Sequence, residues 1–253
     1  MSLYVYCLCD ASEAEAFDGA VGLSNAPVSI LKFGRVAAIV GDLEEGESVA
    51  ATGDNVAAHN LVCSRSLAVA TPLPSRFGAR VSAARLAESV AANEDALVSA
   101  LARVRGCVEM GVKIRDGSAN AKGESQKSKA GSRNAKGCRE KDGDARDGDA
   151  RVGSGTAFLL AKQREILGDE SLKLRAEELA AWLDRRMSGL ARESAVRLRP
   201  SESLVVRAAH LVERGRVAEY RERVRSLGDE RPALQFLTSG PWPPYSFSDI
   251  ESR

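Results

Sequence analysis

The chain has 253 residues, of which 44% are apolar, and its 36 basic and 35 acidic residues leave a formal net charge of +1. This length accommodates one large domain or two small ones. The balanced charge excludes the broad positive field with which proteins capture nucleic acid or anionic lipid. The opening residues lack a cationic segment and reach Asp10 too early for a signal peptide, and no apolar run approaches the ~18 residues of a membrane span. We therefore expect a soluble, cytoplasmic protein without a lipid-membrane partner.

The N-terminal part of the sequence predicts a small α+β domain over residues 1–105. Strands are expected at residues 3–8, 28–33 and 35–40, and helices at residues 54–69 and 82–104. Gly34 between two of these strands indicates a tight hairpin. Asp54 and Ser82 are residue types that cap helix N-termini. The first helix is expected to place four apolar side chains on one face, namely Ala58, Leu61, Val62 and Val69.

The C-terminal part, residues 106–253, predicts strands and helices in the order βαββαβ. The strands are expected at residues 107–114, 196–198, 204–212 and 234–237, and the helices at residues 156–190 and 217–227. This order is that of a ferredoxin-like domain. The predicted fold class is therefore α+β with two domains, a small N-terminal domain and a ferredoxin-like C-terminal domain.

Residues 115–154 interrupt the second domain with a different composition. Their only large aliphatic residue is Val152, and they contain no aromatic residue. Such a segment cannot bury enough apolar surface to offset the entropy lost on ordering. We expect a disordered insertion.

Cysteine and histidine would carry a metal site or a catalytic site. Five scattered cysteines, an odd number, argue against a disulfide framework. Cys7 and Cys9 share one face of a strand, and we expect buried reduced thiols there, with two zinc ligands as the alternative. His59 and Cys63 lie four residues apart on a helix and could pair as base and nucleophile, but no carboxylate stands near to orient them. A structural histidine is expected, without a metal, a cofactor or an enzymatic activity.

The sequence gives little support for binding either nucleic acid or an acidic partner. RNA-recognition modules share the βαββαβ order but stack bases on aromatic side chains of the central strands. The expected central strand 204–212 has no aromatic residue, so nucleic acid is not an expected partner. The arginines around the last helix alternate with glutamates, which predicts a solvated face, with an acidic partner as the alternative.

The segment 240–247, with the sequence GPWPPYSF, holds three prolines and three aromatic residues. Proline favours an extended backbone at low entropic cost, and aromatic rings offer large contact areas. The segment predicts either a rigid tail that clamps its own domain or a binding strip. We expect some of its rings to anchor the tail and the others to stay exposed.

Several short motifs, in this order, resemble the gas vesicle protein family GvpF/GvpL. They are LYVY at residues 3–6, His59, PSRFG at 74–78, EMGVK at 109–113, GTAFL at 155–159, Leu211-Val212 and the segment 240–247. The resemblance spans nearly the whole chain apart from the insertion. Ser75 is a departure, because family members usually have leucine there.

The resemblance implies an accessory or minor structural protein of gas vesicle assembly, located in the cytoplasm and on the vesicle. Its implied partners are the hydrophobic shell protein and other gas vesicle accessory proteins, and no enzymatic activity is implied. A small-ligand-binding regulatory module is the alternative suggested by the ferredoxin-like order. Phe77 is expected to be buried and Arg76 to pair with a carboxylate, with Glu109 as the candidate. The candidate interaction residues are Arg76, Phe77, Trp242, Pro243, Pro244, Tyr245 and Phe247.

Overall fold

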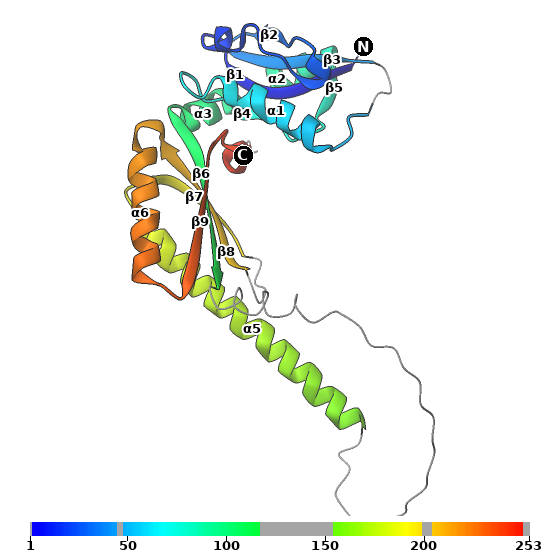
Figure 1. Ribbon diagram of the computed structural model, residues 1–253. Helices are drawn as coiled ribbons and strands as arrows, with labels where there is room; N and C mark the ends of the chain where they lie inside the picture. Colours follow the sequence, from blue (N-terminus) through cyan, green and yellow to red (C-terminus); the bar gives the residue numbers. More distant parts are fainter. Residues whose placement is uncertain (1, 45–47, 117–153, 199–203, 250–253) are drawn as a thin grey trace, which may run out of the picture.

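The computed structural model describes residues 2–44, 48–116, 154–198 and 204–249. These residues form a mixed α/β fold built on two antiparallel sheets, which lie one above the other in Figure 1. Most of the expected insertion, residues 117–153, lies outside the described residues. Its expected ends belong instead to regular structure, because Asp116 ends a strand and Ser154 begins a helix.

The first sheet has the strand order β2-β3-β1-β4, and β5 also pairs with β1. Its strands are β1 (Ser2–Asp10), β2 (Ser29–Phe33), β3 (Val36–Leu43), β4 (Leu73–Pro74) and β5 (Arg80–Ser82). Its helices are α1 (Gly53–Arg65), α2 (Ala83–Ala92) and α3 (Glu94–Val104), and the short 3-10 helices η1 (Ala14–Phe17) and η2 (Leu23–Asn25) precede β2. The hairpin predicted at Gly34 is therefore confirmed, whereas β5, η1 and η2 were not anticipated.

The central strand β1 is buried on both faces. Leu3 and Val5 pack with α2 and α3 in one apolar cluster, whereas Tyr4 and Tyr6 pack with α1 and η1 in another. A strand covered on both faces reads as an almost continuous apolar run, which explains the sequence LYVYCLC. The four cysteines among the described residues are free and buried, as expected for reduced thiols.

Two helices differ from their predictions. The N-cap of α1 is Thr52, whose hydroxyl accepts a hydrogen bond from the Asn55 N–H, rather than Asp54. Leu61 is 68% exposed and Val69 lies beyond the helix end, so these two predictions are wrong, whereas Val62 is buried and Ala58 packs against the same core as expected. The helix expected over 82–104 is divided at Asn93 into α2 and α3.

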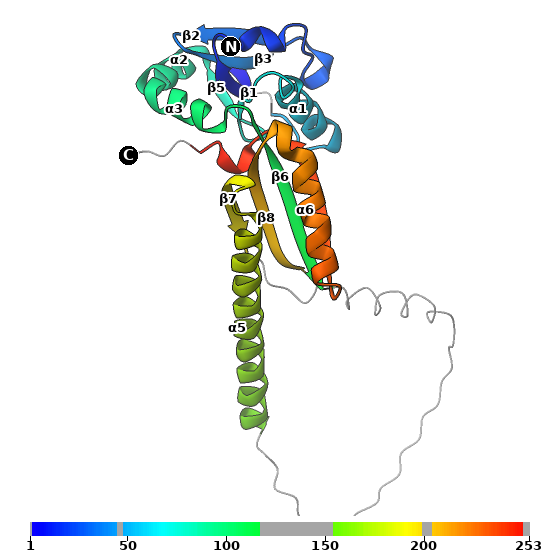
Figure 2. The same cartoon turned by 90° about the vertical axis from the view of Figure 1, so that its left-hand side faces the viewer.

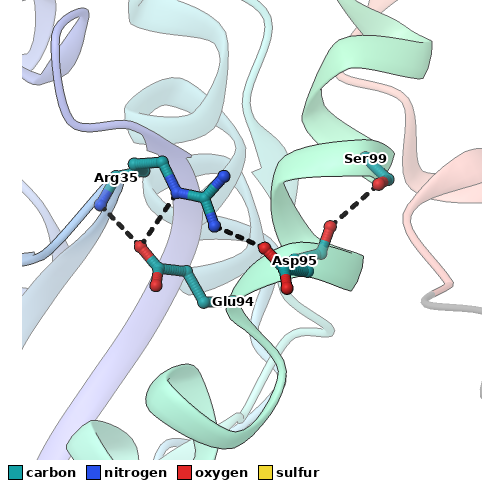
Figure 3. A network of polar contacts seen from close by, with 4 residues as sticks. All are labelled: Arg35, Glu94, Asp95 and Ser99. Atoms are coloured by element: carbon teal, nitrogen blue, oxygen red, sulfur yellow. Dashed lines mark hydrogen bonds and ion pairs between the residues drawn. The ribbon is translucent and has the colours of Figure 1, made fainter.

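A polar network fixes the β2–β3 turn to the start of α3 (Figure 3). The backbone N–H and the Nε of Arg35 both donate to Oε1 of Glu94, at 2.9 and 3.3 Å, and Nη2 donates to Asp95 at 2.5 Å. Both carboxylates lie in the first turn of α3, where the helix dipole favours negative charge. Gly34 has φ +58°, and a Cβ placed there would lie 2.5 Å from Oε1 of Glu94.

The second sheet has the strand order β7-β8-β6-β9, with antiparallel neighbours throughout. Its strands are β6 (Cys107–Asp116), β7 (Ala191–Arg197), β8 (Leu204–Glu213) and β9 (Leu234–Trp242). Its helices are α5 (Ser154–Met187) and α6 (Val217–Glu230), and the 3-10 helices η4 (Arg214–Arg216) and η5 (Tyr245–Phe247) follow β8 and β9. The segment expected as a tail from residue 240 thus begins inside β9.

Both helices of this sheet pack on the same face, while α5 also projects far beyond it (Figures 1 and 2). Alternate residues of β6, from Val108 to Ile114, meet Leu183 of α5 and Val224 of α6 in one core. We call the opposite face, on which Glu109 and Lys113 lie, the open face. No helix among the described residues is long and apolar enough to cross a membrane.

The second core contains a buried histidine. His210 of β8 is fully buried, and its Nδ1 lies 2.8 Å from the hydroxyl of Tyr220. Its Nε2 has no hydrogen-bond partner among the described residues. Burial lowers the pKa of His210 to about 4, against the opposing attraction of Asp184.

Replacing Gly34 by alanine should lower the free energy of unfolding by about 1–2 kcal/mol, because an L-residue is strained at this φ and its Cβ would displace Glu94. Urea denaturation measures the change. Gly215→Ala is the matched control, because its backbone is unstrained and nothing lies within 4 Å of the added Cβ. Equal destabilisation of the two variants would contradict this account of the turn.

The His210 pKa predicts acid sensitivity. Below about pH 6.5 the unfolded chain binds a proton on this imidazole that the folded chain does not. The contribution of neutral His210 to the free energy of unfolding should therefore be present in full above that pH. The free energy of unfolding should fall by up to about 3 kcal/mol as the pH approaches 4. His210→Gln removes this component, and urea titrations across the pH range measure the difference between the two proteins. A difference that does not change with pH would show that His210 does not titrate in this way.

Candidate functional site

A groove with a volume of about 610 Å³ lies where α1 of the first sheet meets the open face of the second. Its lining comes from α1, from the turn before β5, from β6 and from the end of β9 with the residues after it. The lining residues are Gly53, Val56, Ala57, His59, Asn60, Arg76, Phe77, Glu109, Trp242 and Tyr245. Most of this surface is apolar or aromatic, so the groove can accept apolar side chains.

A buried hydrogen-bond network builds one wall of the groove. The Gly78 N–H donates to the Tyr4 hydroxyl, and this hydroxyl lies 2.9 Å from Nδ1 of His59. The other ring nitrogen of His59, Nε2, lies 3.2 Å from the carbonyl oxygen of Ser75. A tautomer with the proton on Nε2 satisfies all of these groups. The network joins β1, α1 and the 75–78 turn, and it therefore positions Phe77, whose ring makes an edge contact with His59.

Cys63 lies beside this network, with Sγ 3.7 Å from Nε2 of His59. Its thiol donates to the carbonyl oxygen of Tyr6, and the residue is fully buried. Burial opposes ionisation of this thiol, whereas hydrogen bonds from Cys7 and His59 act in the other direction and lower the Cys63 pKa. The base–nucleophile pair considered from the sequence is thus adjacent in space, but Cys63 is fully buried and is not among the residues that line the groove.

Glu109 holds the opposite wall. Its two carboxylate oxygens accept hydrogen bonds from the backbone N–H and the hydroxyl of Ser246, at 2.7 and 3.0 Å. Burial raises the Glu109 pKa, and the two Ser246 donors oppose that shift. Trp242 pairs directly with Glu109 across the β6–β9 ladder. Just before it, Gly240 has φ +108°, and a Cβ there would lie 2.7 Å from the Glu109 carbonyl oxygen.

The residues after β9 anchor themselves to the first sheet. Phe247 is 5% exposed and belongs to the apolar cluster of α2 and α3. Arg103 of α3 donates to the Phe247 carbonyl oxygen at 2.7 Å. The Tyr245 hydroxyl donates to Asn60 of α1 at 3.3 Å. The aromatic rings that anchor the tail therefore contact the N-terminal sheet and its helices and not, as expected, the second sheet.

The structure brings together four of the seven candidate interaction residues. Arg76, Phe77, Trp242 and Tyr245 line the groove, whereas Pro243, Pro244 and Phe247 are buried. The expected burial of Phe77 is wrong, because this residue is only partly buried. Arg76 does pair with a carboxylate, as expected, but the partner is Asp249 at 3.8 Å rather than Glu109, whose oxygens are taken by Ser246.

Sequence reasoning missed the contribution of α1. Gly53, Val56, Ala57 and Asn60 follow the i, i+3, i+4, i+7 spacing of one helical face. This spacing could be read from the sequence, but the predicted helix face was chosen from the larger apolar side chains of Leu61 and Val69.

Comparison with known proteins gives consistent matches over the whole chain. The family model described as "Gas vesicle synthesis protein GvpL/GvpF" matches residues 2–249. Gas vesicle protein L of Streptomyces sp. (strain CB03234) is 27% identical, over 98% of this chain and 92% of that protein.

Two solved structures share the fold. Gas vesicle protein GvpF from Anabaena sp. PCC7120 superposes with a TM-score of 0.69 at 18% identity, covering 99% of this chain and 97% of its own. GvpF from Microcystis aeruginosa gives a TM-score of 0.68 at 15% identity, covering 98% and 99%. At these identities the two structures establish the fold alone.

Because Phe247 anchors the tail, its replacement should lower the free energy of unfolding more than the replacement of Trp242. Phe247→Ala should lower the free energy of unfolding by about 3–5 kcal/mol, because the ring is buried in the first core. Trp242→Ala should cost less than half as much, because that ring is 42% exposed. Urea denaturation of both variants measures the order. Should Trp242→Ala be the more damaging change, the tail is anchored differently.

Proposed function

Because the chain belongs to the gas vesicle synthesis protein GvpL/GvpF family, we propose that it is an accessory factor of gas vesicle assembly that binds the hydrophobic shell protein. A role in gas vesicle assembly follows from the family. The shell protein, other gas vesicle accessory proteins as partners, and a location in the cytoplasm and on the vesicle are the finer parts of the proposal. The groove beside Trp242 is the proposed binding site for the shell protein.

The exposure of two aromatic rings at one groove carries this proposal. Trp242 and Tyr245 are 42% and 36% exposed, and the partly buried Phe77 lies in the same lining. Exposed aromatic groups around a preformed concave surface are typical of protein interaction sites. A shell subunit with apolar faces needs such a cover until it polymerises, because exposed apolar surfaces aggregate non-specifically.

The mostly apolar lining favours a protein partner over the small-ligand alternative. Small-ligand sites combine an apolar cavity with a few convergent polar groups that fix orientation. Here both oxygens of Glu109 are already occupied by Ser246, and the guanidinium of Arg76 points to Asp249. A non-enzymatic role is supported by Cys63, because a fully buried thiol bonded to a backbone carbonyl is not presented to a substrate.

We also propose that the second sheet and its helices form the ferredoxin-like domain expected from the sequence. The chain order β6-α5-β7-β8-α6-β9, the sheet order β7-β8-β6-β9 and the single helix-covered face support it. The proposed division into domains 1–105 and 106–253 is supported by the separate sheets. Phe247 crosses this division, because it completes the first core.

Binding of the purified shell subunit tests the function. Trp242→Ala and Tyr245→Ala should each weaken binding, by up to about 30-fold, because an interface aromatic can contribute about 2 kcal/mol. The measurement is a pull-down over a concentration series, together with a melting curve for each variant. Leu61→Ala is the matched control, because Leu61 is exposed on another face of α1. Unchanged binding by both folded aromatic variants, or an equal loss with Leu61→Ala, would refute the groove as the binding site.

A further inference from the structure

The open face of the second sheet carries a row of positive charges that includes Lys113 of β6, four residues beyond the groove residue Glu109. The strand registers place Arg197 of β7 opposite Arg207 of β8, and Arg207 opposite Lys113 of β6. Neighbouring strands are about 4.8 Å apart, so the three Cα atoms span about 10 Å. We call these three residues the basic row. On β9, Leu237 pairs with Lys113 and is 36% exposed, which adds an apolar position at the end of the row.

One acidic group among the described residues acts on the basic row: the charge of Arg197 opposes the burial-raised pKa of Glu109, but both oxygens of Glu109 are already bonded to Ser246. Arg197 and Arg207 are exposed, Lys113 is partly exposed, and none of the three forms an ion pair or a side-chain hydrogen bond with a described residue. Like charges directly opposite each other destabilise a sheet. The free protein therefore carries an electrostatic cost that an acidic partner would relieve.

We propose that the basic row is a docking surface for an acidic helix of a protein partner, which lies across the strands of the open face. Successive turns of a helix rise 5.4 Å, close to the spacing between strands, so carboxylates at i, i+4 and i+7 meet the three cations in turn. An apolar residue on the next turn of that helix would contact Leu237. The row contains no aromatic side chain on which bases could stack, which favours acidic protein over nucleic acid.

A synthetic peptide tests this surface directly. The probe is a fluorescently labelled alanine-based helical peptide with glutamates at i, i+4 and i+7. The control peptide has glutamines at the same positions. Fluorescence anisotropy at low ionic strength should show at least about 10-fold tighter binding of the glutamate peptide, because exposed charge pairs are screened by salt. The absence of any preference for the glutamate peptide overturns the proposal.

Two triple variants with the same loss of charge separate the row from the net charge. The row variant combines Lys113→Gln, Arg197→Gln and Arg207→Gln. The control variant combines Lys32→Gln, Arg85→Gln and Arg185→Gln, three exposed cations without an ion pair to a described residue. The row variant should bind the glutamate peptide at least about 10-fold more weakly, with a melting temperature unchanged or raised, since like-charge repulsion is removed. The control variant should bind like the parent.

Three results would overturn the proposal. Equal losses in the two triple variants would mean attraction by net charge alone, and a lowered melting temperature of the row variant would mean a structural role. Equally tight, row-dependent binding of a single-stranded oligonucleotide would mean a nucleic-acid surface. Trp242→Ala should leave peptide binding intact, so failure of the shell-binding groove and failure of the basic row are distinguishable.

Discussion

The two hydrogen bonds from Ser246 to Glu109 are the contact on which the arrangement of both sheets around the groove depends. A partly desolvated carboxylate is costly unless its oxygens are bonded, and these two donors meet that requirement. The same contact turns the chain after β9 toward the first sheet, where Phe247 enters the core beneath α2 and α3. One side chain of β6 therefore holds the end of the chain described here against the other sheet, and the groove is the space left between them.

The order of the main elements could be predicted because each has its own local pattern. The βαββαβ order of the second part follows from apolar periodicity within single segments, and the hairpin at Gly34 follows from a glycine between two apolar runs. The two-residue β4 and three-residue β5 are too short to show a period, and they exist because β1 offers them partners. The end of β9 was missed because its prolines favoured a tail, although Trp242 still pairs with Glu109.

The candidate site was predictable in its residue types but not in its geometry. Proline and aromatic content identified residues 240–247, yet which rings would be buried depends on contacts with α3, over 100 residues earlier in the chain. On α1 the buried face is set by His59, whose two ring nitrogens bind Tyr4 and Ser75. Apolar content alone could not reveal this, because a polar residue occupies the interior position and Leu61 faces solvent.

The position at which the chain leaves the second sheet has a practical consequence. β6 begins beside the groove and runs for ten residues, about 33 Å, to Asp116. The next described residue, Ser154, begins the half of α5 that projects beyond the sheet (Figure 1). Because the cost of closing a loop rises only with the logarithm of its length, this point can accept additional chain at little cost. It is a permissive site for inserting a reporter domain, which would sit at the opposite end of the sheet from the groove and leave both anchoring contacts of the tail untouched.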